Sequence, residues 1–233
     1  MTVSGLGLLG FGFVLGLRHA LDVDHLAAVS TIVSQRRSVR AAALVGAVWG
    51  VGHTLATLAA AVVIVGLRAD VPPLVAAALE LGVAAMLVVL GANLLLTLHR
   101  GGRLHVHGHA HGGRAHRHLH VHAPGDKGPH RHGVSAARRP LLVGLVHGLA
   151  GSAALMLAVV ATIRSTPLAL AYVAVFGIGS IAGMVAMSAL LGVPLALASQ
   201  RFARAEAVIG GCAAVASIAV GVGLAWHIVT IAA

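Results

Sequence analysis

Long apolar segments, separated by short polar connections, make up most of this sequence. A transmembrane helix needs about 20 consecutive and mostly apolar residues. The segments that meet this requirement lie at roughly 5–33, 40–67, 74–98, 141–163, 168–199 and 205–231. Pro72, Pro73 and Pro167 fall in turns between segments, and Pro194 is expected to kink the fifth helix. The pattern therefore predicts an all-α integral membrane protein with six transmembrane helices.

The composition agrees with a lipid environment. Hydrophobic residues make up 58% of the 233 residues, charged residues only 9%, and the mean hydropathy is +0.96, whereas a soluble domain carries about a quarter charged residues. Because Lys127 is the only lysine, no G-x-x-x-x-G-K-[ST] phosphate-binding loop exists, which excludes a P-loop ATPase. The single cysteine, Cys212, excludes an intramolecular disulfide and a thiolate metal cluster. The N-terminus lacks the basic region of a signal peptide, so we expect no cleavage before Arg18.

The formal net charge of +10 comes from arginines that lie between the apolar segments. In this setting it predicts orientation by the positive-inside rule and contact with anionic lipid head groups, not a nucleic-acid partner. Arginines gather in the first, third and fifth connections, whereas the second and fourth hold only Arg68 and Arg164. We therefore predict a multi-pass protein of the inner or plasma membrane, with the odd-numbered connections in the cytoplasm and both termini outside.

The third connection, residues 99–140, is rich in histidine. Its length and its glycine and proline content predict disorder. Many of the histidines occupy every second position: His105, His107, His109, His111, His116, His118, His120 and His122. Alternate residues of an extended chain project to the same side, so each run offers several imidazoles to one Ni, Cu, Zn or Co ion. The alternative is a polar, pH-sensitive linker. If the loop does bind metal, a cytoplasmic metallochaperone is a candidate partner.

A weak internal repeat relates the two parts of the chain on either side of this loop. The stretch GLRHALDVDHLAAV (16–29) aligns with GLVHGLAGSAALML (144–157), and WGVGHTLAT (49–57) aligns with FGIGSIAGM (176–184) at almost the same offset. The alignment places His147 opposite His19. The repeat predicts that three helices are followed by three related helices.

The repeat sets the expected domain organisation. Residues 1–98 form a first three-helix repeat, residues 99–140 form the histidine-rich loop, and residues 141–233 form a second three-helix repeat. Because each repeat has an odd number of spans, the second lies inverted relative to the first. Many secondary transporters are built in this way around a site near the bilayer midplane.

The first apolar segment contains a dense group of ionisable residues: Arg18, His19, Asp22, Asp24 and His25. Burying Asp or Arg at the centre of a membrane helix costs about 2.5–3.5 kcal/mol. His19, Asp22 and His25 share one stripe of an α-helix, whereas Asp24 lies off it, so either Asp24 faces another helix or the segment is partly unwound. Imidazole and carboxylate together favour Ni²⁺, Co²⁺, Zn²⁺ or Fe²⁺. The alternative is a salt bridge from Arg18 to either aspartate, for which two histidines are not needed.

Other polar residues in the apolar segments are weaker candidates. His53, among small residues, and His147, at the repeat position of His19, are candidate metal ligands or hydrogen-bonded core residues. Glu80 and Asn93 are candidate supporting or proton-relay groups, and Glu80 has an interfacial position as its alternative. We expect His227 to lie at the membrane interface.

The stretch HALDVDH at 19–25 resembles the H-x4-D-H motif of the nickel/cobalt transporter family. The stretch GHT at 52–54 is similar to that family's L-G-H-[ST] motif, and GLVHGLAGS at 144–152 is similar to its six-helix urease-accessory membrane permease subgroup, whose members often carry a histidine-rich loop. The resemblance implies a six-helix permease for Ni²⁺ or Co²⁺ with His19, Asp24 and His25 as its selectivity core.

The favoured hypothesis is a secondary transporter, not an enzyme, that takes up a divalent ion, Ni²⁺ or Co²⁺, as cargo and carries no prosthetic group. An efflux permease with the same fold is the first alternative. An intramembrane metal-dependent hydrolase with Glu80 as its base is a second, and metal chaperoning by the loop is a third. An inward-negative potential of 100 mV supplies about 2.3 kcal/mol per charge to uptake.

Overall fold

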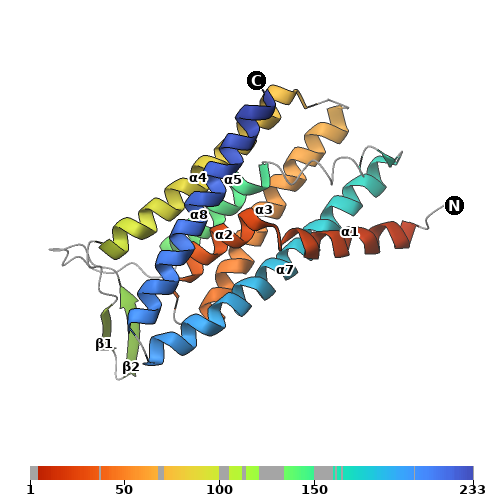
Figure 1. The fold of residues 1–233 in the computed structure, drawn as a ribbon. Coiled ribbons are helices and arrows are strands. Elements are labelled where there is room, and N and C mark those ends of the chain that lie inside the picture. Colours follow the sequence, from red (N-terminus) through yellow and green to blue (C-terminus); the bar gives the residue numbers. More distant parts are fainter. Residues whose placement is uncertain are drawn as a thin grey trace.

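The computed structural model describes residues 5–36, 38–67, 71–99, 105–111, 114–120, 134–149, 160, 162–163, 165–201 and 203–232. Within these residues the chain is dominated by helices (Figure 1). The helices are α1 (Gly5–His19), α2 (Val23–Val33), α3 (Val39–Leu67), α4 (Pro73–His99), α5 (Val134–Leu149), α7 (Thr166–Arg201) and α8 (Ala203–Ala232). Two short strands, β1 (His105–His111) and β2 (Arg114–His120), lie between α4 and α5 in the chain.

Four single helices among the described residues are long and apolar enough to cross a membrane: Val39–Gly66, Pro73–His99, Thr166–Leu197 and Ala207–Thr230. A fifth candidate is the pair α1 and α2, which meet at a bend of 55° and can form one broken span. The chain is therefore a multi-pass integral membrane protein. The fourth predicted span, 141–163, is described only in part, because α5 covers its beginning and 150–159 lie outside the described residues.

The break between α1 and α2 falls at the group of ionisable residues. The backbone N–H of Leu21 donates to the carbonyl of Arg18, and that of Asp22 donates to the carbonyl of His19, in tight turns that end α1. Asp22 then adopts an extended backbone conformation (φ −62°, ψ 146°) directly before α2. A short polar side chain favours such a non-helical position at a helix start. The partial unwinding that the sequence predicted as one alternative is therefore present in the structure.

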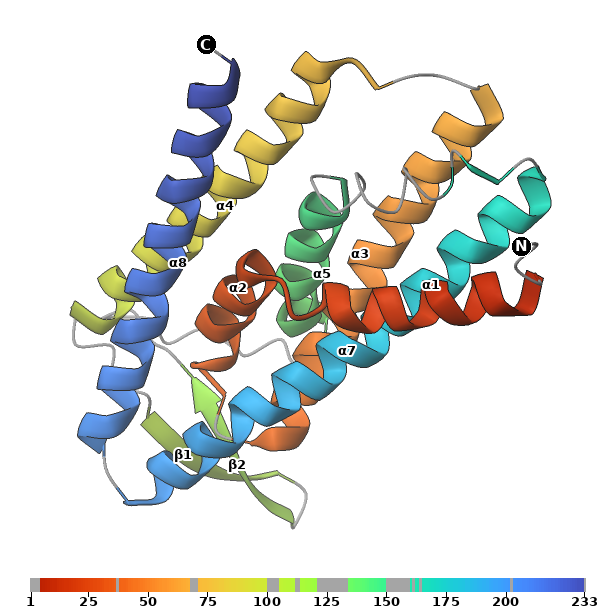
Figure 2. The ribbon, with the colours of Figure 1, turned by 45° about the vertical axis from the view of Figure 1, so that its right-hand side comes forward.

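The helices pack in a small number of extensive pairs: α3 with α7, α3 with α5, α1 with α7, and α4 with α8 (Figure 2). Glycines allow two of these close approaches. A Cβ on Gly16 of α1 would collide with the carbonyl oxygen of Phe176 on α7, and a Cβ on Gly144 of α5 would collide with that of Trp49 on α3. Trp49 is fully buried and belongs to the larger hydrophobic core, which surrounds α2. The packing therefore holds α2 and its break inside the bundle.

Part of the histidine-rich loop forms a hairpin where we expected disorder. Strands β1 and β2 pair antiparallel, with His105 opposite His120, His107 opposite His118, and His109 opposite His116. The alternation of histidine with other residues has the period of two that is typical of a strand. The hairpin lies at the same end of the bundle as the C-terminal end of α7 and the N-terminal end of α8 (Figures 1 and 2). His122 lies outside the described residues.

Candidate metal centre

Four histidines from four helices converge at the break between α1 and α2. His19 is the last residue of α1, His25 lies in the first turn of α2, and His53 and His147 come from α3 and α5. All four are buried. The ring centre of His25 lies 4.4 Å from that of His19 and 4.1 Å from that of His147, and the ring centres of His19 and His53 are 5.1 Å apart. Close packing of the surrounding helices thus places four imidazoles side by side in the bundle.

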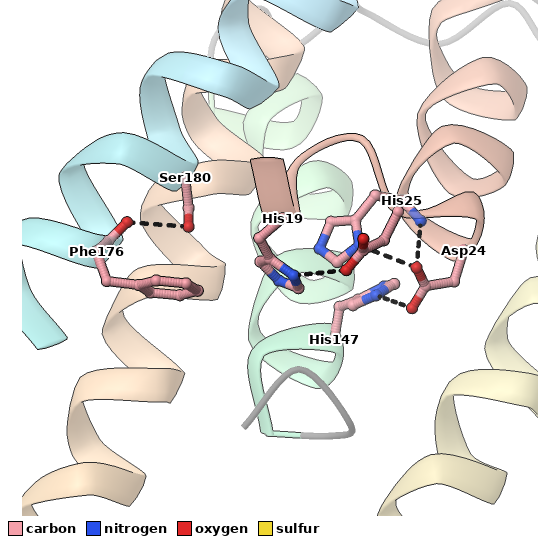
Figure 3. Close-up of polar contacts among 7 residues, drawn as sticks. His19, Asp24, His25, His147, Phe176 and Ser180 are labelled. Atoms are coloured by element: carbon pink, nitrogen blue, oxygen red, sulfur yellow. Dashed lines mark hydrogen bonds and ion pairs between the residues drawn. The ribbon is translucent and has the colours of Figure 1, made fainter. Parts of the chain in front are cut away.

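Two aspartates hold three of these rings in place (Figure 3). Nδ1 of His19 lies 2.8 Å from Oδ2 of Asp22. Asp24 bridges two rings, with Oδ1 3.1 Å from Nδ1 of His25 and Oδ2 2.9 Å from Nε2 of His147. A carboxylate on one ring nitrogen fixes the orientation and tautomer of an imidazole and makes the opposite nitrogen a better metal ligand.

The opposite nitrogens are buried and have no hydrogen-bond partner among the described residues. They are Nε2 of His19, Nε2 of His25, Nδ1 of His147 and both ring nitrogens of His53. A buried polar atom without a partner costs about 1–3 kcal/mol, and five such atoms in one cluster need an explanation. A bound dication would satisfy the lone pairs. The donor set therefore fits a metal ion.

The potential ligands fall into two groups. One ligand atom from each of His19, His25 and His53 lies within 4.8 Å of the others, and the same holds for Asp24, His25 and His147. Imidazole nitrogen with a carboxylate oxygen suits Ni²⁺, Co²⁺ or Zn²⁺ better than Mg²⁺ or Ca²⁺, which prefer oxygen alone. We call these five residues together with Asp22 the histidine–aspartate cluster. They are the six residues of the membrane segments that the sequence indicated as candidate metal ligands.

The alternative of a salt bridge from Arg18 is not what the structure has. Arg18 is exposed, and no ion pair joins it to Asp22 or Asp24 within the described part of the chain. Both aspartates pair with histidines instead. The other alternative that the sequence predicted, that Asp24 faces another helix, is also present, because Asp24 of α2 contacts His147 of α5.

The remaining candidates lie elsewhere. Glu80 is half-buried and Asn93 is exposed, both on α4, and neither belongs to the two ligand groups. His227 is exposed on α8. The loop histidines His105, His107, His109, His111, His116, His118 and His120 are placed by their backbone in the hairpin, apart from the cluster.

Two aromatic residues that the sequence reasoning did not single out border the cluster. The indole of Trp49 stacks on His25, with ring centres 5.4 Å apart and planes inclined by 27°, and meets His147 edge-on at 5.8 Å. Phe176 lies 5.5 Å from His19. The internal repeat in the sequence could have pointed to these two residues, because it aligns Trp49 with Phe176. Each aromatic ring thus borders a cluster histidine from the part of the chain on the other side of the histidine-rich loop.

Comparison with known proteins gives two matches. The family model for the high-affinity nickel-transport protein (NicO) matches residues 5–148, a range that contains the whole histidine–aspartate cluster. The urease accessory protein UreH of Bacillus sp. (strain TB-90) is 33% identical over 204 residues, which cover 85% of this chain and 82% of that protein. No solved structure matches.

Proposed function

This chain belongs to the family of high-affinity nickel-transport proteins, and from that premise we propose that its histidine–aspartate cluster binds Ni²⁺ during uptake across the membrane. Family membership confirms the resemblance seen in the sequence motifs, and it makes the chain a metal-ion transporter and not an enzyme. The direction of transport, the ligands and the energy source are the proposed parts.

The observation that carries the proposal is the set of buried imidazole nitrogens that have no partner in the described part of the chain, at the break in a candidate span. An ion that leaves water must be met by ligands that replace its hydration shell, and a broken helix supplies them within the membrane. Charge also balances, because a dication between Asp22 and Asp24 brings the formal charge of that group to zero. Charges buried with a partner cost far less than charges buried alone.

The ligand chemistry favours transport over permanent storage. No cysteine lies in the cluster, since Cys212 is exposed on α8, and soft thiolates would hold a late-transition metal tightly. A transport site must bind its ion well enough to dehydrate it and weakly enough to release it. A histidine and carboxylate set meets both needs. We propose Ni²⁺ as the main cargo because the family's description names nickel, with Co²⁺ as the chemically closest competitor.

Uptake can be powered by the membrane potential alone. A membrane potential of 100 mV supplies about 2.3 kcal/mol per charge, so at this potential a dication gains about 4.6 kcal/mol on moving to the negative interior. This is equivalent to a concentration ratio of more than a thousandfold, since 1.4 kcal/mol corresponds to tenfold. No coupling ion or nucleotide is required for a secondary transporter of this kind.

Reciprocal packing supports the proposed arrangement of two inverted three-helix repeats. Gly16 packs against Phe176 and Gly144 packs against Trp49, and the repeat aligns each member of one pair with its counterpart in the other. Exchanging the two repeats therefore exchanges α1 with α5 and α3 with α7. This is the behaviour of an approximate two-fold axis.

The third helices obey the same relation. A Cβ on Gly91 of α4 would meet the carbonyl oxygen of Ala214, and a Cβ on Gly221 of α8 would meet that of Ala84. Gly221 follows Gly91 by 130 positions, and Ala214 follows Ala84 by the same 130. Since each repeat has an odd number of proposed spans, the axis lies in the membrane plane, as in other inverted-repeat transporters.

We also propose that the histidine-rich loop, 99–140, lies in the cytoplasm and receives the ion after release. The many imidazoles of the hairpin strands favour such a role. Because the cluster is built from other parts of the chain, deleting residues 103–132 should reduce uptake without abolishing it. Complete loss with an intact bundle would point instead to a chaperone whose function depends on the loop.

The direct test is accumulation of ⁶³Ni²⁺ by proteoliposomes with an imposed inside-negative potential. We expect uptake by the wild-type protein and loss of at least about 10-fold on replacing a cluster ligand, as in His25→Ala, since a single lost ligand or supporting group costs about 10–100-fold in metal affinity. His227→Ala is the matched control, because His227 is an exposed histidine outside the cluster. Uptake by His25→Ala equal to that of the wild type would remove the cluster from the transport path.

A further inference from the structure

We infer that the histidine–aspartate cluster contains two overlapping binding stations for the transported ion, and that His25 belongs to both. Station A consists of His19, His25 and His53; station B consists of Asp24, His25 and His147. The inference rests on the proposed function and specifies how the ion passes through the site.

The two nitrogens of His25 point to different stations. Nδ1 lies 3.1 Å from Oδ1 of Asp24, which places it on the side of station B. Nε2 is buried without a partner among the described residues and is the atom left for station A, where Nε2 of His19 likewise has no partner among them. Either nitrogen of an imidazole can bind a metal ion. His25 can therefore hold the ion on one edge of its ring and accept it on the other.

The ligand atoms of station B are already at the spacing that an ion requires. Two ligands at right angles around an ion with bonds of about 2.1 Å lie about 3.0 Å apart. The two distances from Asp24 in this station are 2.9 Å to Nε2 of His147 and 3.1 Å to Nδ1 of His25. In this structure these atoms are joined by hydrogen bonds, so the ligands of station B are the nitrogens that face Asp24 and not the unpartnered nitrogens of the same rings. A dication can take the place of the shared protons with little movement of the side chains.

The stations differ in charge, and each has a partly exposed carboxylate beside it. Station A offers three imidazoles and no carboxylate, whereas station B includes the carboxylate of Asp24, whose side chain is 32% exposed. Asp22, 53% exposed, lies against His19 at the edge of station A. The histidines between these carboxylates are buried. The arrangement gives the ion a short path from Asp22 through His25 to Asp24.

The repeat gives an independent reason to separate the stations. His19 and His147 occupy equivalent positions in the two repeats, and each belongs to only one station. The position equivalent to His25 is Ala153, so only the first repeat supplies the shared ligand. Two weak stations that share a ligand let an ion step onward without passing through an unbound state in a dry interior. This meets the general need of a transport path for sites that an ion can leave.

Co²⁺ binding to the purified protein in detergent tests the inference, because the visible absorption of Co²⁺ reports the number and kind of its ligands. His53→Ala should bind Co²⁺ at station B, and His147→Ala should bind it at station A, with different spectra. The variant that keeps the stronger station should bind Co²⁺ about as tightly as the wild type, and the other variant should bind it more weakly. His25→Ala and the double variant His53→Ala/His147→Ala should both lose binding. Failure of His53→Ala to bind Co²⁺ while His147→Ala retains it would overturn station B.

A conservative variant separates a ligand from a positioning role. His147→Asn keeps an N–H donor for Asp24 but removes the imidazole. If His147 is a ligand of station B, this variant should keep Co²⁺ binding at station A but lose at least about 10-fold in ⁶³Ni²⁺ flux. Wild-type flux in His147→Asn would show that His147 only orients Asp24, and would end the two-station account. Absence of Co²⁺ binding and Ni²⁺ flux in the wild type itself would instead overturn the proposed function.

Discussion

Nε2 of His147 lies 2.9 Å from Oδ2 of Asp24, in a hydrogen bond between residues 123 positions apart in the sequence. The contact joins α5 of the second proposed repeat to α2 of the first. Because Asp24 also reaches His25 through its other oxygen, one carboxylate sets the position of two imidazoles. The cluster is thus completed only when the two parts of the chain pack together.

Asp24 and Asp22 should differ in their importance for transport. Asp24→Asn removes a charge that is shared by His25 and His147, and we expect Ni²⁺ uptake to fall by about 10–100-fold. Among the described residues Asp22 pairs with one ring, that of His19, and it is 53% exposed, so Asp22→Asn should cost less than Asp24→Asn. Initial rates of ⁶³Ni²⁺ uptake at several concentrations measure both variants. A larger loss for Asp22→Asn would show that the carboxylate bridge is not the central element of the site.

The close approach of α5 to α3 gives a prediction about stability. A Cβ at position 144 would overlap the backbone carbonyl of Trp49, which cannot move without displacing α3. Gly144→Ala should therefore destabilise the protein by roughly 1–3 kcal/mol, the usual cost of overpacking. Gly82→Ala, on α4 and with nothing within 4 Å of the new Cβ, should be neutral or slightly stabilising. Thermal unfolding followed by size-exclusion chromatography compares the two, and equal stability would contradict the packing.

Hydropathy predicted the extent of the helices well but not their contacts. The segments expected at 40–67 and 74–98 are observed at 39–67 and 73–99, because the transfer of side chains into lipid depends only on how many apolar residues lie in a row. The same physics cannot show which helices meet. The contact between Asp24 and His147 depends on small residues such as Gly144, which let two backbones approach closely. Such an approach involves two segments that are far apart in the sequence, so the hydropathy of either segment alone does not predict it.

The cluster shows the same division. His19 and His25 were identifiable because charged and imidazole groups are costly in hydrocarbon and need a reason to be there. His53 stood alone among small residues, and only the fold shows that it faces the others. Trp49 was missed because an aromatic residue in an apolar helix is unremarkable until its ring is found stacked on a ligand.

Trp49 should report metal binding by its fluorescence. Its indole lies 5.4 Å from the ring of His25, and paramagnetic Ni²⁺ or Co²⁺ quenches a fluorophore at such short range. The chain has two tryptophans, so Trp226→Phe, which changes a side chain that is 73% exposed, leaves Trp49 as the sole emitter. We expect saturable quenching in this variant and its loss when His25→Ala is added. Quenching that persists without His25 would place the ion away from the cluster.

The orientation that the arginines predict for the bundle can be measured with single cysteines. Ser38, in the α2–α3 connection, and Pro72, in the α3–α4 connection, are both exposed and lie at opposite ends of the candidate span Val39–Gly66. On a background of Cys212→Ser, the positive-inside rule predicts that Ser38→Cys faces the cytoplasm and Pro72→Cys faces outward. A membrane-impermeant thiol reagent should then label Pro72→Cys in intact cells and Ser38→Cys only in inside-out vesicles.

The opposite pattern would place the arginine-rich connections outside. It would also place the histidine-rich hairpin there, because the hairpin lies at the same end of the bundle as the α2–α3 connection (Figure 2), and a hairpin outside the cell could not receive an imported ion.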